Sequence, residues 1–134
     1  VLIEFPVSTI SSEITDGTIE SGSNFVLRLF STEQPVTPPK EFTLVIAAVS
    51  GAWNEGTGPD LANKDYTGAS NWISASTGVA WTSTGGDFYA SPRFTASFTT
   101  GEEDISIDVT SLVGEWIEGT KENHGFGRSP RQEY

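Results

Sequence analysis

The chain has 134 residues, enough for one domain with a buried core. Its 18 acidic and 7 basic residues give a net charge of −11, which disfavours binding to a phosphate backbone or to an anionic membrane surface. Because it has no cysteine, disulfides and thiolate metal sites are excluded, and no apolar run is long enough to span a bilayer. We therefore expect neither nucleic-acid binding nor membrane insertion.

The sequence contains no methionine and begins directly within an apolar segment. We interpret residues 1–134 as a single domain that is part of a longer chain. Fourteen glycines and seven prolines, among many serines and threonines, are typical of short strands joined by many turns. The composition therefore favours an all-β domain.

The first half of the chain alternates between strand patterns and irregular segments. A strand is predicted over residues 1–5, followed by a polar loop over residues 8–22. Residues 25–30 alternate as a strand, and residues 42–49 are apolar on both faces, as in a central strand covered on both sides. The simplest pairing joins these two strands as an antiparallel hairpin, with the proline-rich residues 31–40 as an irregular connection.

The second half begins with an irregular, glycine-rich segment over residues 51–70. A connection of that length is usually functional or wraps the surface of a domain. Short strands are predicted around residues 71–74, 80–83 and 93–99, and another where apolar and polar residues alternate over 104–110.

After residue 110 the apolar period changes to that of a helix. The residues that share one helical face are Leu112, Val113, Trp116 and Ile117. They predict a short helix over residues 111–118, with Thr110 or Ser111 capping its start and Gly119 ending it.

Four stretches stand out in order: VLIEFPVSTI at the start, AWNEGTGPD over 52–60, GGDF over 85–88, and IDVTSLVGEWIEGTKENHGF over 107–126. Together they resemble DNRLRE-type jelly-roll domains, across most of the chain. The resemblance implies an all-β fold, a jelly-roll-like antiparallel β-sandwich with one short helix near the C-terminus. It also implies that Trp53 and Trp116, which lie in the matching stretches, are core residues.

The chain departs from that family after Phe126. The family continues into a final apolar strand, whereas residues 127–134 read GRSPRQEY, which is polar and interrupted by proline. We therefore expect the last strand to be missing or cut short. The exposed sheet edge there, and the one at Val1, would be completed by another chain or by further residues.

No constellation of residues indicates catalysis, and we expect no enzymatic activity. The single histidine, His124, lies in the turn NHGF, and no serine stands in a Gly-x-Ser-x-Gly elbow. Glycoside hydrolysis would need two carboxylates meeting across a cleft, which spacing along the sequence does not show. The available carboxylates are Glu55, Asp60, Asp87, Asp104 and Asp108.

Calcium is the candidate metal, because it takes carboxylate and carbonyl oxygens. The candidate ligands are Asp60 and Asp65 in the long loop, with Asp104 and Asp108 on the predicted strand. No EF-hand pattern is present, and the acidic run at 102–104 is more typical of a solvated surface. We expect no cofactor, with a structural calcium as the open alternative.

Carbohydrate binding is the other chemistry that the aromatic residues suggest. Sugars stack their C–H faces on exposed rings while polar side chains take the hydroxyls. The candidate platform comprises Trp72, Trp81, Phe88 and Tyr89 with Asn71, Asp87 and Arg93. Trp72, within SNWIS, is the best candidate for an exposed ring, and the alternative is that these rings are core.

The resemblance implies two functions, because such domains occur in secreted and cell-surface proteins, in related carbohydrate-binding modules and in tailed-phage virions. The first is a non-enzymatic structural or adhesion domain of a virion (fibre, baseplate or capsid decoration) or of a cell-surface assembly. Its partners would be copies of itself or neighbouring virion or surface proteins. The second is a carbohydrate-binding module of a secreted glycan-active protein. A module should present Trp72 with Trp81 or Tyr89 on one face, whereas an assembly protein should bury these rings against a neighbour.

Overall fold

The computed structural model describes residues 1–33, 35–57 and 68–128 of the chain. The strands are β1 (Leu2–Ile3), β2 (Val26–Leu29), β3 (Phe42–Val49), β4 (Ser74–Ser76), β5 (Val79–Ala80), β6 (Phe88–Phe98), β7 (Ile105–Asp108) and β8 (Phe126–Arg128). The helices are α1 (Val7–Thr15) and α2 (Thr110–Glu118).

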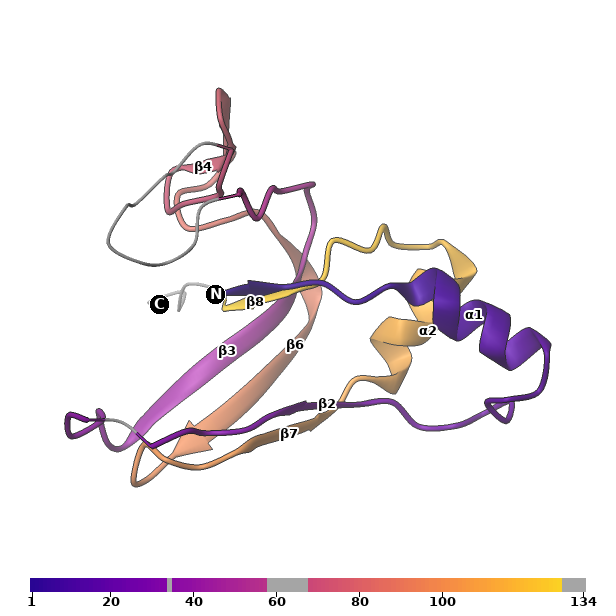
Figure 1. Ribbon diagram of the computed structural model, residues 1–134, viewed down its shortest axis with the longest axis horizontal. Helices are drawn as coiled ribbons and strands as arrows, with labels where there is room; N and C mark the ends of the chain where they lie inside the picture. Colours follow the sequence, from indigo (N-terminus) through magenta and orange to yellow (C-terminus); the bar gives the residue numbers. More distant parts are fainter. Residues whose placement is uncertain (34, 58–67, 129–134) are drawn as a thin grey trace.

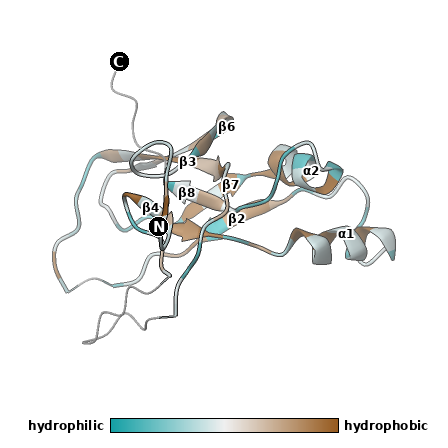
Figure 2. Cartoon of the chain, turned by 90° about the horizontal axis from the view of Figure 1, so that it is seen from above, coloured by the Kyte–Doolittle hydropathy of each residue, from teal (hydrophilic) through white to brown (hydrophobic). Residues whose placement is uncertain are grey.

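The strands form antiparallel sheets, as Figure 1 shows. A four-stranded sheet has the order β1-β8-β3-β6, β2 pairs with β7, and β4 pairs with β5. The helices lie side by side at the end of the molecule away from β4 (Figures 1 and 2). The mostly β, antiparallel architecture is confirmed, and the jelly-roll connection of the strands stays a prediction. No helix in the described residues is long and apolar enough to cross a membrane.

Strand β3 lies at the centre of the fold because both of its faces are buried. Ile46 and Ala48 belong to one hydrophobic core and Val49 belongs to a second. In the sheet, β3 lies between β6 and β8, so that Ala47 is opposite Arg93 on one side and Gly127 on the other. The prediction of a central strand over residues 42–49 is therefore confirmed.

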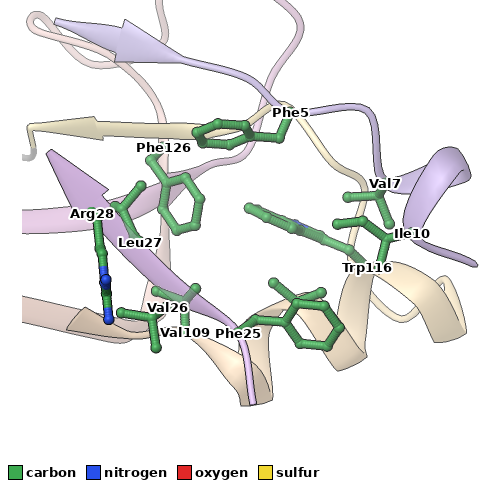
Figure 3. Close-up of a pocket in the computed structure, with 11 residues that line it drawn as sticks. Phe5, Val7, Ile10, Phe25, Val26, Leu27, Arg28, Val109, Trp116 and Phe126 are labelled. Atoms are coloured by element: carbon green, nitrogen blue, oxygen red, sulfur yellow. The ribbon is translucent and has the colours of Figure 1, made fainter. Parts of the chain in front are cut away.

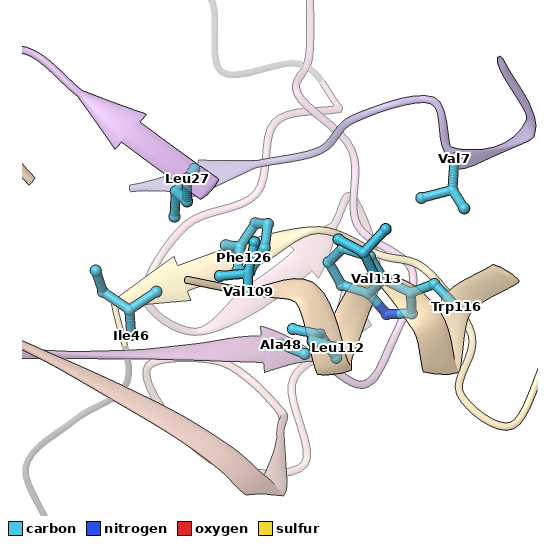
Figure 4. Close-up of a cluster of buried hydrophobic side chains, with 9 residues drawn as sticks. All are labelled: Val7, Leu27, Ile46, Ala48, Val109, Leu112, Val113, Trp116 and Phe126. Carbon is cyan, nitrogen blue, oxygen red and sulfur yellow. The ribbon is translucent and has the colours of Figure 1, made fainter. Parts of the chain in front are cut away.

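The larger core fills the space between the four-stranded sheet, the β2–β7 pair and the helices (Figure 4). Its buried members are Val7, Leu27, Ile46, Ala48, Val109, Leu112, Val113, Trp116 and Phe126. Trp116 meets Phe126 edge-on, with the ring centroids 5.0 Å apart. Burial of aromatic and aliphatic area stabilises a small domain. Leu112, Val113 and Trp116 are buried here, so α2 covers this part of the core.

Helix α2 begins at Thr110, one residue before the prediction, and ends at Gly119 in the left-handed conformation, as predicted. Its cap differs from the prediction of Thr110 or Ser111. The Asp108 carboxylate accepts the Thr110 N–H at 2.9 Å, and the Thr110 hydroxyl instead accepts the N–H of Phe25 at 2.8 Å. That second bond ties the start of the helix to the start of β2.

The prediction of a loop over residues 8–22 is wrong for residues 8–15, because Val7–Thr15 forms α1, and holds for residues 16–22. Its serines, threonines and β-branched residues have weak intrinsic helix propensity. Val7 and Ile10, three residues apart on one face, pack on the larger core. The hydroxyls of Ser12 and Thr15 donate to carbonyls one turn earlier, so the polar side chains are satisfied within the helix. Tertiary packing therefore overrides local propensity.

The predicted hairpin between residues 25–30 and 42–49 is also wrong. Both strands exist, but β2 pairs with β7, Leu27 lying opposite Ile107, while β3 pairs with β6 and β8. Leu27 and Ile46 belong to the same buried cluster, so the two strands face each other across the core. The proline-rich connection therefore carries the chain from one sheet to the other.

The last strand was expected to be missing or cut short, and only the first alternative is wrong. Phe126–Arg128 forms β8, which inserts between β1 and β3. Phe126 supplies the apolar face, and a Cβ on Gly127 would lie 2.7 Å from both the Leu2 side chain and the Phe88 ring. A strand of three residues can pack here because Gly127 has no side chain, which lets the side chains of Leu2 and Phe88 lie directly against it. In the described residues β1 remains an edge strand, as expected.

The strands predicted at 71–74 and 80–83 share only one residue each with β4 and β5, whereas most of the strand predicted at 93–99 lies in β6. Strand β6 is much longer than predicted and begins at Phe88. It turns into β7 through a loop closed by Glu103, whose carboxylate accepts the N–H groups of Thr99, Thr100 and Gly101. This turn joins the two sheets of the larger core.

We predict that Gly125→Ala destabilises the fold more than Gly119→Ala does. Both glycines have a left-handed φ, 76° and 74°, so each substitution carries a strain of about 1–2 kcal/mol. Only at position 125 does the new Cβ overlap the Ile3 carbonyl, whereas nothing lies within 4 Å of it at position 119. We expect a further loss of about 1–3 kcal/mol in the free energy of unfolding, measured by urea denaturation. Equal effects would contradict the β1–β8 packing.

We predict that Glu103→Gln lowers stability at neutral pH and that this difference fades in acid. The N–H of Thr100 has the largest effect on the Glu103 carboxyl and lowers its pKa. The N–H groups of Thr99 and Gly101 act in the same direction and desolvation acts against them, so that the pKa is lowered to about 2. A depressed folded-state pKa contributes stability that is present above the ordinary value of 4.5 and is lost as the pH falls to about 2.

Urea midpoints measured from pH 7 down to 2 would test this prediction. Glu102→Gln is the matched control, because no described bond to these N–H groups involves its side chain. A difference between wild type and Glu103→Gln that stays constant across this range would contradict the assignment.

Candidate functional site

A cleft of about 500 Å³ opens beside the start of β1, the segment after β3 and the β4–β5 hairpin. Three indole rings line it, those of Trp53, Trp72 and Trp81. The polar side chains in its lining are those of Glu55, Ser70, Asn71 and Arg128. We call this site the tryptophan cleft.

The three rings differ in how they are held. Trp81 is 8% exposed and donates its Nε1–H to the Asn71 carbonyl at 2.8 Å. Trp53 is half-buried and donates its Nε1–H to the His124 carbonyl at 2.9 Å. Trp72 is 63% exposed. The cleft thus combines two fixed rings with one open ring.

Trp72 lies in a short segment that its own backbone and Asn71 shape. The Asn71 Oδ1 accepts the N–H groups of Ile73 and Ser74, and the Trp72 carbonyl accepts the N–H of Gly85 at 2.7 Å. Such a side-chain-to-backbone turn is a common role of asparagine. In the described residues the Asn71 Nδ2 group has no protein partner, so it is available to a ligand.

The charged groups of the cleft are also available. Neither Glu55 nor Arg128 forms an ion pair within the described part of the chain, and both side chains are exposed. The site therefore offers one carboxylate and one guanidinium beside the rings, with no net charge between them. Such a pair suits a ligand with several hydroxyl groups, which both donate and accept.

The structure divides the predicted platform. Asn71, Trp72 and Trp81 lie together in the tryptophan cleft, whereas Tyr89 packs against the larger core on the other face of the sheet. The Tyr89 hydroxyl accepts the N–H of Glu122, and Lys121 lies over its ring at 5.6 Å. Phe88 packs against the smaller core with Val49, Ala75 and Trp81.

Asp87 and Arg93 also lie outside the cleft lining. Desolvation acts to raise the pKa of Asp87, but bonds from the N–H groups of Thr82 and Ser83 lower it overall. Asp87 therefore shapes the turn that follows Trp81. Arg93 donates its Nε–H to the Ala90 carbonyl at 3.2 Å.

Sequence reasoning named Glu55 only as one of the carboxylates available for hydrolysis, missed Arg128, and assigned Trp53 to the core. Trp53 is half-buried and does pack against the smaller core, while Trp116 is buried as expected. The WNE run, which places Trp53 and Glu55 two residues apart, is the only local signal for this part of the site. Arg128 reaches the cleft through β8, which the sequence did not predict.

The predicted calcium ligands are placed only in part, and calcium binding stays a prediction. Asp104 accepts the N–H of Ser31 at 2.7 Å and Asp108 accepts that of Thr110, so each carboxylate already serves the backbone. Asp60 and Asp65 lie outside the described residues. Among the described residues, no group of three or more histidine and acidic side chains is placed to hold a metal ion.

Comparison of the chain with protein-family models, with curated proteins and with solved structures found no match. The resemblance to DNRLRE-type domains therefore stays a prediction that depends on the four quoted stretches.

Proposed function

We propose that this chain is a non-enzymatic adhesion domain that binds carbohydrate in the tryptophan cleft. The observation that carries the proposal is the open ring of Trp72 in one concave site with two fixed indoles, a carboxylate and a guanidinium. A sugar ring would stack on Trp72, while Glu55, Arg128 and the Asn71 Nδ2 group would bond its hydroxyls.

The character of the cleft favours a neutral, hydroxyl-rich ligand. Its volume of about 500 Å³ falls within the range of small-molecule sites, about 300–1,000 Å³. The chain's net charge of −11 disfavours polyanions, including nucleic acid. A short, uncharged oligosaccharide meets both conditions.

Binding without hydrolysis is part of the proposal. Glycoside hydrolysis uses two carboxyl groups on either side of the scissile bond. Among the described residues, Glu55 is the one carboxylate that lines the cleft. His124 contacts the Glu122 carboxylate at 3.1 Å and lies outside the lining, so it does not complete a catalytic pair there.

The resemblance to DNRLRE-type domains supports placing this domain on a virion or a cell surface. A carbohydrate-binding module of a secreted glycan-active protein would use the same cleft. A purely structural role is the second candidate, and the exposed apolar side chains around β4 and β5 favour it. These are Trp72, Ile73 and Val79, which a copy of the chain or a neighbouring surface protein would cover.

We predict that Trp72→Ala abolishes a glycan signal that the wild type gives on a glycan array. Loss of an aromatic stacking face costs about 1–3 kcal/mol per stacked ring in nucleic-acid sites, so we expect affinity to fall roughly tenfold or more by calorimetry. Ile73→Ala is the control, because Ile73 is equally exposed but does not line the cleft.

Two outcomes would count against carbohydrate binding. One is a folded wild type that binds no glycan on the array. The other is a wild-type oligomer, seen by sedimentation, that Trp72→Ala and Ile73→Ala both dissociate; that result would favour the structural role.

A further inference from the structure

A second concave site lies on the other face of the four-stranded sheet. It is an apolar groove of about 320 Å³ between β2, the two helices and the segment after β1 (Figure 3). Phe5 and Phe126 lie on one side and Phe25 and Val26 on the other, with Trp116 projecting between them (Figure 3). We call it the β2 groove, and it shares no lining residue with the tryptophan cleft.

The groove exists because the two sheets of the larger core are unequal. Four strands face only β2 and β7, and β2 has no neighbour on its other side in the described residues. The side chain of Phe5, which a further strand beside β2 would cover, instead lines the groove next to the buried Phe126 ring. Phe5 remains 41% exposed and Val26 45% exposed.

The register of β2 shows which backbone groups face this open side. The Phe25 carbonyl accepts the N–H of Val109, and the N–H of Ser31 reaches the Asp104 carboxylate, so odd-numbered residues bond toward β7. In an antiparallel pair the intervening residues direct their N–H and C=O groups the other way. Those of Val26 and Arg28 therefore point to the free edge, which is a template for another strand.

Two polar side chains at the groove also lack partners. The indole Nε1–H of Trp116 is buried and has no acceptor, a condition that costs about 1–3 kcal/mol. The Arg28 guanidinium is exposed and forms no ion pair or hydrogen bond with the described residues. The buried Nε1 group of Trp116 is out of an occupant's reach, whereas an occupant that supplies a carboxylate would pair with the exposed Arg28 guanidinium.

We propose that the β2 groove binds an extended segment of a different protein, which adds a strand to the free edge of β2. In the bound segment, the residues opposite Val26 and Arg28 point away from the core, and the residue beside Arg28 is acidic. The intervening residues are apolar and fill the groove between Phe5 and Phe25. A second copy of this chain is disfavoured as the occupant, since each copy carries a net charge of −11.

The test uses a blocked nine-residue peptide, TVTVEVTVT, with a central glutamate, and calorimetry with the full chain. We expect saturable binding, and at least a tenfold loss of affinity when the glutamate is replaced by lysine. Arg28→Glu should reverse that preference. When the peptide pairs antiparallel to β2 with its glutamate opposite Arg28, the backbone N–H groups of its threonines and glutamate face β2. N-methylation of these amides should abolish binding, whereas N-methylation of the valine amides should not.

Two variants of the same residue separate strand addition from apolar adhesion. Val26→Pro removes an N–H that points to the free edge, and proline is tolerated on edge strands, so the variant should fold and lose binding. Val26→Ala shortens the same side chain but keeps the N–H, so the loss of affinity in Val26→Pro should exceed that in Val26→Ala at least tenfold by the same calorimetry. Circular dichroism and urea midpoints report folding independently of any glycan.

Three results would overturn the proposal. The first is no saturable peptide binding by folded wild type. The second is equal binding of the two methylated peptides, which would indicate apolar adhesion without strand pairing. The third is a homodimer that Val26→Pro dissociates, which would make a second copy the occupant.

Discussion

The burial of β3 on both faces is the constraint on which the rest of the structure depends. Ile46 and Ala48 require a cover on one side and Val49 on the other, so one sheet must support two separate cores. The helices and the β2–β7 pair supply the first cover, and the tryptophan-bearing segments around β4 and β5 supply the second. Each cover is only partly complete, and an open site lies at each: the tryptophan cleft on one face and the β2 groove on the other.

The tryptophan cleft is rigid because two of its rings also pack in the smaller core. Trp53 and Trp81 are core-packing residues whose N–H groups are bound by backbone carbonyls, so their rings are fixed by the same contacts that cover Val49. A preformed site loses little conformational entropy when a ligand enters. Trp72 projects from a turn held by Asn71, which places an exposed ring on a fixed base.

The sequence predicts elements whose apolar pattern is local. It does not predict elements that depend on packing against distant segments. β3 was predictable from its nearly continuous apolar run, and α2 from an apolar period of 3.6 residues that ends at Gly119. α1 was not, since its serines and threonines conceal the spacing of Val7 and Ile10. The cleft shows the same division. Asn71, Trp72 and Trp81 belong to one segment, whereas Glu55 and Arg128 meet them only through tertiary structure.

The carboxylates show why residue type alone is a weak guide to a site. Asp87 was a candidate for sugar binding, and Asp104 and Asp108 were candidates for calcium. Each instead accepts backbone N–H groups: Asp87 in the turn after Trp81, Asp108 at the start of α2, and Asp104 from Ser31 after β2. In a chain of many short strands, turns leave numerous N–H groups without partners, and aspartate is well suited to accept them. The high acidic content therefore serves the fold in part. Among the charged groups that have no partner in the described residues, Glu55 and Arg128 line the tryptophan cleft and Arg28 lines the β2 groove.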